Sequence, residues 1–420
     1  MILHGRLLVS AYRAPEPGWV RVEGGRIVEI SDGHPPERPD YGDARALITP
    51  GFVDAHIHLP QIESVGCDGM ELLEWLDQIV FPSEIWWERG GCEPMLRTAV
   101  RRMVREGTCG FAGYLTSDPV TAQWAAMSLR ESPSLPRMRC AVGRVAMDRN
   151  APDELTRHDI ERAGIGKGVS VALPDACASE DVEVSVNPRF AISCTEELLA
   201  ECGWWAERKT EAGHAPIVQT HLSEQMAECQ TVRELFPKIA HYTGVYDTAG
   251  LLGERTLLAH CVHVSDAEWE MIRERGSVVV HCPTANTFLR SGLFDQDAAR
   301  AHGVRMALGS DVAGGPDVAL PRVARGMIEV AKVRAMTGGA SATIPSPAGV
   351  WEMITRGNAD ALGWSDVGRI EEGARADLLV MRFPETWYDE HMIGRLLYGW
   401  SSRLIETRLI KGVPVDPGSI

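Results

Sequence analysis

The chain has 420 residues, of which 45 % are hydrophobic and 24 % charged, and these shares are typical of a folded globular protein rather than a disordered or fibrous one. Its length suits one large domain with a smaller one, or two domains. The formal net charge of −16 repels phosphate backbones and argues against nucleic acid as a partner.

The sequence shows no signal for export or membrane insertion. Its first residues, MILHGRLLVS, lack a basic segment, and their apolar run is short and interrupted, unlike that of a signal peptide. No run of about 18 uncharged apolar residues occurs, and the ten cysteines are scattered singly without a CxxC pair. We therefore expect a cytoplasmic protein with reduced thiols and no membrane partner.

Both ends of the chain predict short β-strands joined by glycine-containing turns. Residues 1–46 contain LHGRLLVS and GWVRVEGGRIVEIS, and residues 368–420 contain GRIEEGARADLLVMRF and IETRLIKGVPV. We expect these two segments to combine into one small β-sandwich domain.

Residues 47–367 predict an α/β fold in which strands alternate with helices. Eight runs of β type appear in the order ALITPGFVDAHIH, GTCGFAGYLT, MRCAVGRVAMD, VEVSVNPRFAIS, PIVQTHL, TLLAHCVHV, SVVVHCPTAN and VRMALGSDV. Helical patterns include 71–79, 95–104, 196–209, 265–275 and 319–333. Eight parallel strands, each followed by a helix, form a (β/α)8 TIM-like barrel, whose functional groups gather at the C-terminal ends of the strands.

Polar residues that could do chemistry stand at the end of most of these runs. They are His56, His58, Arg189, His221, His260, His281 and Asp311. In a barrel of this kind the strand ends meet at one face, so we expect these side chains to converge there.

The HIH sequence at the end of the first run predicts a metal site. Alternate residues of a strand point to the same side, so His56 and His58 can offer two imidazoles to one ion. His221 and Asp311 add a third nitrogen and a carboxylate, a donor set that suits Zn²⁺ or Fe²⁺. A histidine pair alone is often structural, so the prediction rests on the whole set together with His260. Water bound to such an ion has its pKa lowered toward ~7.

One metal ion is expected rather than two. A second ion in such a barrel usually needs a bridging carboxylated lysine, and before Glu211 the chain has only Lys167 and Lys209. Lys209 falls in a helical pattern and Lys167 in the segment GIGKGVS, away from every predicted strand end.

Glu224 follows His221 by three residues in the segment HLSE. A glutamate just beyond a strand end can carry a proton between an activated water and a leaving nitrogen. The same position also suits a solvated glutamate in the first turn of a helix. The neighbouring His221 favours the catalytic role.

The sequence resembles the amidohydrolase superfamily and, within it, the guanine deaminase family. The resemblance is carried by PGFVDAHIHLPQ, LLEWLDQIVFPSE, NPRFAISCTEEL, THLSE, YDTAGLL, AHCVHVSDAE, HCPTANTFLRSGLF and LGSDVAGG, and GRIEEGARADLLV adds an ending common in the superfamily. These blocks run from Pro50 to about Gly315 and cover almost the whole predicted barrel.

This resemblance implies a set of roles for named residues. The ligands of one zinc ion per subunit, with Fe²⁺ as the alternative, are matched by His56, His58, His221 and Asp311. The catalytic groups are matched by Glu224, Asp311 and His260. The substrate-binding residues are matched by Gln61, Arg189, Phe190, His221, Glu224 and His260. The implied reaction is hydrolytic deamination of guanine to xanthine and ammonia, in a homodimeric enzyme.

Chemistry explains why three of these residues would hold a purine. The flat ring of Phe190 suits a flat heterocycle. Arg189 is a permanent donor for a ring carbonyl, and Gln61 has both a donor and an acceptor for a lactam or amidine edge. A donor left unpaired by the wrong ring costs ~1–3 kcal/mol, which is enough for discrimination.

Several alternatives stay open at the level of sequence. A deaminase of 8-oxoguanine or a pterin is one, because the segment PDVALPR at 316–322 departs from the guanine deaminase pattern and can reshape a substrate loop, whereas the departure at Gln225 is expected to be tolerated. A metal-free relative that only binds a partner is less favoured, since all four ligands and Glu224 are present. His281 can approach the site or form a structural hydrogen bond. LLEWLDQIVFPSE can form a lid, a buried helix face, or both.

Overall fold

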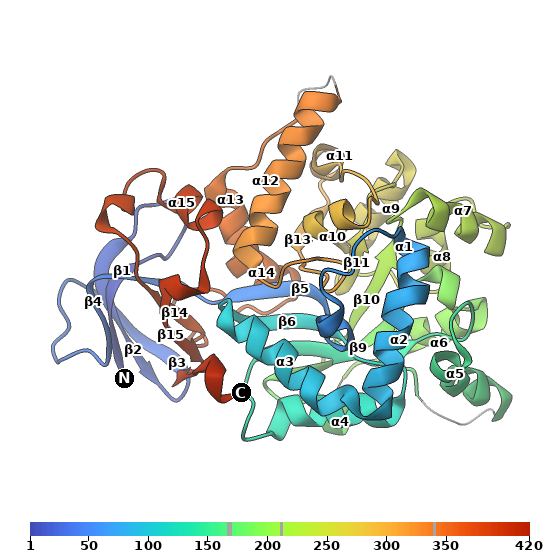
Figure 1. Ribbon diagram of the computed structural model, residues 1–420, viewed down its shortest axis with the longest axis horizontal. Helices are drawn as coiled ribbons and strands as arrows, with labels where there is room; N and C mark the ends of the chain where they lie inside the picture. Colours follow the sequence, from blue (N-terminus) through green and yellow to red (C-terminus); the bar gives the residue numbers. More distant parts are fainter. Residues whose placement is uncertain (166–169, 211–212, 339–341) are drawn as a thin grey trace.

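The computed structural model of the protein describes residues 1–165, 170–210, 213–338 and 342–420, and its larger part is the predicted barrel (Figure 1). The barrel strands are β5 (Phe52–His58), β6 (Thr108–Tyr114), β7 (Arg139–Gly143), β9 (Val182–Pro188), β10 (Ile217–Leu222), β11 (Thr256–His260), β12 (Val278–His281) and β13 (Arg305–Leu308). They are parallel and hydrogen-bonded in the order β13-β12-β11-β10-β9-β7-β6-β5, and the short β8 (Val145–Ala146) pairs with β9. Every residue of β5, β6, β11 and β12 is buried, as expected for parallel strands covered on both faces.

Backbone hydrogen bonds close the barrel next to the candidate site. The N–H of Asp311 donates to the carbonyl of His56 at 2.8 Å, and the N–H of His58 donates to the carbonyl of Val312 at 3.0 Å. The segment after β13 is therefore held against the end of β5, although the two strands are far apart in the sequence.

Helices lie around the barrel and toward the sheet formed by the chain ends, and each helical range predicted from the sequence falls on one or more of them (Figure 1). They are α1 (Leu72–Trp75), α2 (Phe81–Trp86), α3 (Cys92–Arg105), α4 (Pro119–Glu131), α5 (Asp153–Ile165), α6 (Glu196–Ala206), α7 (Met226–Leu235), α8 (Tyr242–Thr248), α9 (Asp266–Arg275), α10 (Pro283–Phe288), α11 (Gln296–Ala301), α12 (Leu320–Thr337), α13 (Pro347–Glu352), α14 (Asn358–Ala361) and α15 (Met392–Tyr398). The helix predicted at 196–209 ends at Ala206, and the one predicted at 319–333 continues to Thr337.

Short 3-10 and π-helical turns lie between these helices. The 3-10 turns are η1 (Leu59–Ser64), η4 (Asp175–Cys177), η5 (Ala191–Ser193), η7 (Glu385–Trp387), η8 (Ser402–Leu404) and η9 (Pro417–Ser419). The π turns are η2 (Leu76–Val80), η3 (Trp87–Gly91) and η6 (Met353–Gly357). The predicted helix at 71–79 is thus α1 followed by η2, and the helical run goes on through α2 and η3 into α3.

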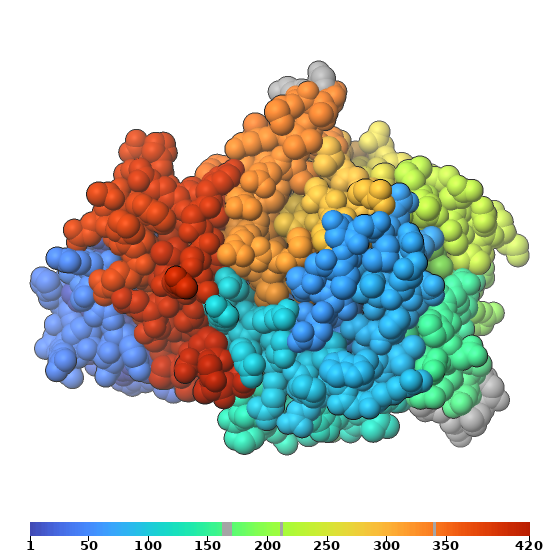
Figure 2. All heavy atoms as spheres, in the orientation of Figure 1, coloured from blue at the N-terminus to red at the C-terminus, as the bar shows by residue number. Residues whose placement is uncertain are grey.

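The two ends of the chain form a second, mixed sheet beside the barrel, the small β domain expected from the sequence. Its strands are β1 (Ile2–Leu7), β2 (Glu16–Glu23), β3 (Arg26–Asp32), β4 (Tyr41–Pro50), β14 (Leu378–Met381), β15 (Ile405–Ile410) and β16 (Val413–Pro414), in the order β16-β15-β14-β4-β1-β2-β3. Figure 2 shows the first and last parts of the chain, blue and red, against each other at one end of the molecule. The predicted boundaries at 46/47 and 367/368 stay a prediction. Across the described residues, none of the helices has both the length and the apolar character needed to cross a membrane.

Candidate active site

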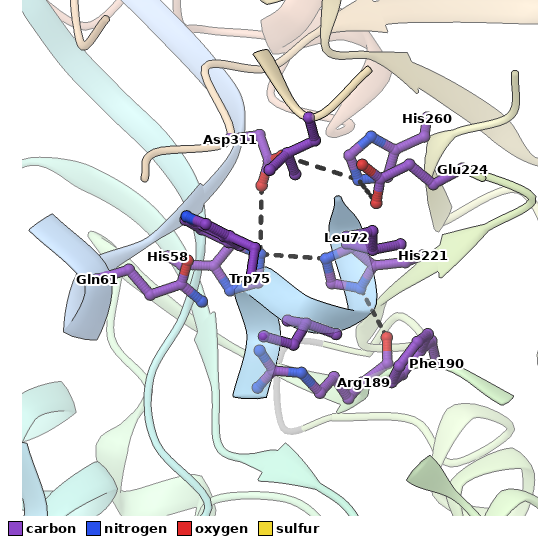
Figure 3. Close-up of a pocket in the computed structure, with 12 residues that line it drawn as sticks. His58, Gln61, Leu72, Trp75, Arg189, Phe190, His221, Glu224, His260 and Asp311 are labelled. Atoms are coloured by element: carbon purple, nitrogen blue, oxygen red, sulfur yellow. Dashed lines mark hydrogen bonds and ion pairs between the residues drawn. The ribbon is translucent and has the colours of Figure 1, made fainter. Parts of the chain in front are cut away.

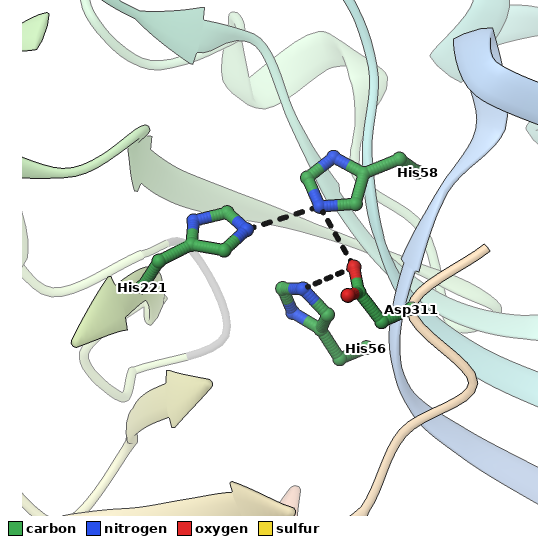
Figure 4. Close-up of side chains that lie close together, drawn as sticks. All are labelled: His56, His58, His221 and Asp311. Atoms are coloured by element: carbon green, nitrogen blue, oxygen red, sulfur yellow. Dashed lines mark hydrogen bonds and ion pairs between the residues drawn. The ribbon is translucent and has the colours of Figure 1, made fainter. Parts of the chain in front are cut away.

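Four predicted ligands meet at the C-terminal end of the barrel (Figure 4). His56 and His58 end β5, His221 lies in β10, and Asp311 follows β13. One donor atom from each lies within 4.8 Å of all the others. The Nε2 atoms of His58 and His221 are 3.1 Å apart, and Oδ1 of Asp311 lies 3.2 Å from His56 Nε2 and 3.4 Å from His58 Nε2.

The chemistry of this donor set fits a divalent metal ion. Burial, followed by the neighbouring charged groups, holds the pKa values of His56, His58 and His221 well below their ordinary value, so the three imidazoles are neutral near pH 7. The Nε2 atom of His221 presents a lone pair 3.1 Å from Nε2 of His58, and a cation between the two rings would bind both nitrogens. Nε2 of His56 is buried and has no hydrogen-bond partner among the described residues. Three nitrogens and a carboxylate are donors that zinc and ferrous iron accept.

Outer contacts orient two of the histidines. Nδ1 of His221 donates to the carbonyl of Arg189 at 2.6 Å, which leaves Nε2 facing the cluster. Nδ1 of His260 donates to Oδ1 of Asn286 at 2.8 Å in the same way. A carbonyl or amide oxygen can only accept, so each contact fixes the tautomer of its ring.

Backbone strain accompanies the strand ends. His260 has φ 71°, Ser223 φ 49° and Asp311 φ 49°, all in the left-handed region that non-glycine residues rarely occupy. Such conformations cost ~1–3 kcal/mol each and are found at active sites where the surroundings enforce them. Here Asp54 contributes to that enforcement, because its carboxylate accepts hydrogen bonds from the N–H and hydroxyl of Ser310.

Glu224 and His260 lie on one side of the pocket, next to the metal cluster (Figure 3). Oε2 of Glu224 is 3.4 Å from His260 Nε2, which is 3.8 Å from Oδ2 of Asp311. Ser291 donates its hydroxyl hydrogen to the other Glu224 oxygen at 2.8 Å. Burial and the charge of Asp311 raise the pKa of Glu224 to about 8, and burial raises the pKa of Asp311 to about 6.

The alternative of a solvated first-turn glutamate is wrong for Glu224. Gln225 is the N-cap of α7, so Glu224 precedes the helix, and only 3 % of its surface is exposed. Gln225, which departs from the family pattern, has a structural role, because it forms the capping box of α7 with Glu228.

The pocket above the cluster contains all the residues predicted to bind substrate. The space above the cluster, part of which is open to solvent, is about 390 Å³. The residues that line it are His58, Gln61, Leu72, Trp75, Leu76, Arg189, Phe190, His221, Glu224, His260, Leu289 and Asp311. Of the predicted site residues, only His56 lies outside this lining. That the predicted residues act as ligands, catalysts or substrate contacts remains a prediction.

The LLEWLDQIVFPSE stretch both covers the pocket and packs as a buried face. Leu72, Trp75 and Leu76 line the pocket and are 3 to 8 % exposed. The sequence did not single these residues out as pocket residues, because their spacing is equally typical of a helix in the core.

Other positions that the sequence analysis discussed do not line the pocket, as far as the structure describes them. His281 stacks on Phe294 with ring centres 4.5 Å apart, and burial lowers its pKa to about 3. The segment 316–322 leads into α12 and is not part of the lining. Lys209 follows the end of α6, whereas Lys167 lies outside the described residues.

Polar residues that the sequence did not assign also support the site. Ser291 and Asn286 hold Glu224 and His260, as described above, and Glu84 on α2 contacts both Gln61 and Arg189. Glu84 belongs to the FPSE end of a block that carries the family resemblance, and that block is the one signal that could have pointed to it.

Comparison with known proteins assigns the family. The amidohydrolase family matches residues 47–415, and the chain belongs to this family. It is 32 % identical over 383 residues to guanine deaminase of Escherichia coli (strain K12), covering 89 % of this chain and 83 % of that protein. It is 31 % identical over 395 residues to guanine deaminase of Homo sapiens, covering 88 % and 83 %. A crystal structure of guanine deaminase from C. acetobutylicum with guanine bound in the active site covers 99 % of both chains with a TM-score of 0.86 and 27 % identity.

Proposed function

We propose that this chain catalyses the hydrolytic deamination of guanine to xanthine and ammonia with one zinc ion per subunit. The observation that carries the proposal is the convergence of His56, His58, His221 and Asp311 beside Glu224 in a pocket that also contains Gln61, Arg189 and Phe190. The similarity to proteins named guanine deaminase supports the choice of substrate.

The zinc ion would be held by three histidines and Asp311, the donor set described above. When bound, such an ion lowers the pKa of a coordinated water toward ~7 and so supplies hydroxide near neutral pH. Fe²⁺ accepts the same ligands, and metal analysis decides between the two.

Proton transfer falls to residues next to that cluster. Glu224, with its pKa raised to about 8, carries a proton near neutral pH and can give it to a ring nitrogen of the substrate. Asp311, the carboxylate of the donor cluster, can accept a proton from the attacking water. The water oxygen adds to the ring carbon that bears the amino group. His260 lies between the two carboxyl groups, so it can hydrogen-bond this added oxygen. The proton held by Asp311 then passes to the amino group, which leaves as ammonia, and the proton of the new hydroxyl group returns to Glu224.

Substrate recognition falls to the opposite side of the pocket. The ring of Phe190 offers an apolar face to a flat base, and its centre is 6.5 Å from that of His221. Arg189 and Gln61 offer hydrogen bonds to the edge of the base that lies away from the metal. The same arrangement would also admit an 8-oxoguanine or a pterin, which is why the assay must include them. We also propose that the enzyme works in the cytoplasm as a homodimer, in line with the family resemblance of its sequence.

Metal analysis and an ammonia-release assay on the purified protein test this proposal. We expect one zinc ion per chain and a higher kcat/KM for guanine than for 8-oxoguanine, isoxanthopterin or adenine. The variant His221→Ala is the matched control for metal-dependent activity. A higher kcat/KM for 8-oxoguanine or the pterin would refute guanine as the substrate, and a metal-free wild-type protein with full activity would refute the mechanism. Light scattering tests the dimer.

A further inference from the structure

We propose that Glu84 is a positioning residue that fixes the Gln61 amide and the Arg189 guanidinium, so that the pocket selects a heterocycle with a ring N–H beside a carbonyl. This inference rests on the proposed function, because it takes the pocket to be the base-binding site. Glu84 does not line the pocket itself, whereas both of its partners do.

Glu84 makes short contacts to both recognition residues. Its Oε1 accepts a hydrogen bond from Gln61 Nε2 at 3.1 Å. Arg189 donates from Nη1 to Oε1 at 2.9 Å and to Oε2 at 2.8 Å. The side chain of Glu84 is 1 % exposed and that of Arg189 is 4 % exposed, so this ion pair is shielded from water. A buried carboxylate with a guanidinium partner is held in place strongly, since losing either partner leaves a charge without compensation.

The short helix α2 holds both partners from one side. Phe81, at its start, places its ring 5.3 Å from Cζ of Arg189. Ser83 donates its hydroxyl hydrogen to the carbonyl of Pro60 at 2.8 Å, directly before Gln61 in the chain. Glu84 follows on the same helix and joins the two. In Figure 3 Gln61 and Arg189 lie on the side of the pocket away from His260 and Glu224.

The contact with Glu84 decides which end of the Gln61 amide faces the pocket. An ionised carboxylate can only accept hydrogen bonds, so the NH₂ group of Gln61 must face Glu84. The carbonyl oxygen of Gln61 is then left for a ligand. Arg189 uses Nη1 for Glu84, which leaves its Nε and Nη2 donors. In the part of the chain that the structure describes, neither Oε1 of Gln61 nor Nη2 of Arg189 has another hydrogen-bond partner.

An acceptor beside a donor matches one kind of heterocycle edge. A lactam edge offers a ring N–H to Gln61 Oε1 and a carbonyl oxygen to Arg189. An amidine edge, with a bare ring nitrogen beside an amino group, would bring oxygen against a lone pair and guanidinium against an amine. Sites that hydrogen-bond a substrate group strongly reject the analogue that lacks it, because the buried groups are left unpaired. Glu84 thereby sets the preference without touching the substrate.

A pair of substrates isolates this effect. Guanine and 2,6-diaminopurine share the ring and the 2-amino group, and they differ in that the first has a lactam edge and the second an amidine edge. In E84Q the new amide can donate as well as accept a hydrogen bond. The side-chain amide of Gln61 can then rotate, so that its NH₂ group instead of its oxygen faces the pocket. We expect the ratio of kcat/KM for guanine to kcat/KM for 2,6-diaminopurine to fall by roughly tenfold or more in E84Q. E84D keeps an acceptor-only group and should retain most of the ratio.

Controls separate this role from a structural one. E93Q changes an exposed glutamate on α3 that pairs with Arg97, and it should leave the ratio unchanged. Metal content should stay the same in all these variants. If E84Q lowers kcat/KM for both substrates by the same factor, Glu84 is only structural and the inference is overturned. If the wild-type enzyme does not deaminate guanine at all, the proposed function fails, which is a distinguishable result.

A second comparison applies if E84Q does not fold because the charge of Arg189 is left buried. The double variant E84Q/R189Q replaces the charged pair by two amides and is compared with R189Q alone. The ratio for the two substrates should be lower in the double variant than in R189Q. Equal ratios in the two would overturn the inference.

Discussion

A buried carboxyl group behind the proposed proton shuttle makes the stability of this protein depend on pH. Glu228, on α7, accepts hydrogen bonds from the backbone N–H of Glu224 at 2.7 Å, from that of Gln225 at 3.1 Å, and from the hydroxyl of Tyr242 at 2.7 Å. Burial, with the charge of Glu224, raises the pKa of Glu228 to about 7, and the three hydrogen bonds oppose this rise. Burial therefore outweighs the hydrogen bonds.

The size and sign of the effect follow from this pKa. The gap between about 7 in the folded protein and the ordinary value of 4.5 corresponds to about 3 kcal/mol, at ~1.4 kcal/mol for each pH unit. The folded state binds the proton more tightly, so this stabilisation is complete below about pH 4.5 and is lost as the pH rises through 7. The variant Glu228→Gln cannot titrate. Its amide oxygen can still accept from both backbone N–H groups, and its NH₂ can donate to Tyr242.

Unfolding measurements at several pH values test this prediction. The unfolding free energy of the wild-type protein, minus that of E228Q, should fall by about 2.5 kcal/mol between pH 5 and pH 8, which is most of the total change. Both proteins are compared with their metal bound. E234Q, at an exposed position of the same helix, is the control and should run parallel to the wild type. Parallel curves for E228Q and the wild type would refute the reasoning, since they would mean that Glu228 stays ionised in the folded protein.

Three further predictions concern the metal and the proton path. H221A and D311N should lose metal and activity together, as measured by metal analysis and ammonia release. A chelator should abolish wild-type activity until Zn²⁺ or Fe²⁺, but not Mg²⁺, is returned. Activity that survives complete metal removal would contradict this. E224Q should keep its metal while kcat falls by ~10²–10⁴-fold, the range for a lost general acid or base; a kcat near the wild-type value would exclude the shuttle role. N286A frees Nδ1 of His260 and should lower kcat by ~10–100-fold with unchanged metal content, and an unaltered kcat would show that this contact is dispensable.

The barrel was predictable from the sequence because its strands are buried on both faces. Such strands appear as short, nearly continuous apolar runs, and β5, β6, β11 and β12 are buried throughout. Their ends had to lie at one face of the barrel, so the histidines that close these runs could be expected to converge. The run MRCAVGRVAMD is less regular than expected, since β7 and β8 are separate strands and β8 pairs with β9.

Side-chain contacts made across the fold could not be predicted in the same way. Ser291 reaches Glu224 and Asn286 reaches His260 from segments after β12, and no local pattern marks a serine or an asparagine for such a role. The π-helical turn η2 was also missed, because the spacing of Leu72, Trp75 and Leu76 is that of an ordinary helix. These features depend on tertiary contacts, which a single sequence does not reveal.

Backbone hydrogen bonds hold two residues of the site in unusual conformations. The left-handed conformation of Asp311 is held by the hydrogen bond from its N–H to the carbonyl of His56 and by the contacts of Ser310 with Asp54. That of His260 is followed by a hydrogen bond from Cys261 N–H to the carbonyl of Leu222. Strain of this kind persists only where the surrounding structure enforces it, so these backbone contacts help to orient the donors. In the proposed mechanism, the barrel therefore holds both the metal donors and the groups that carry protons at the ends of its strands.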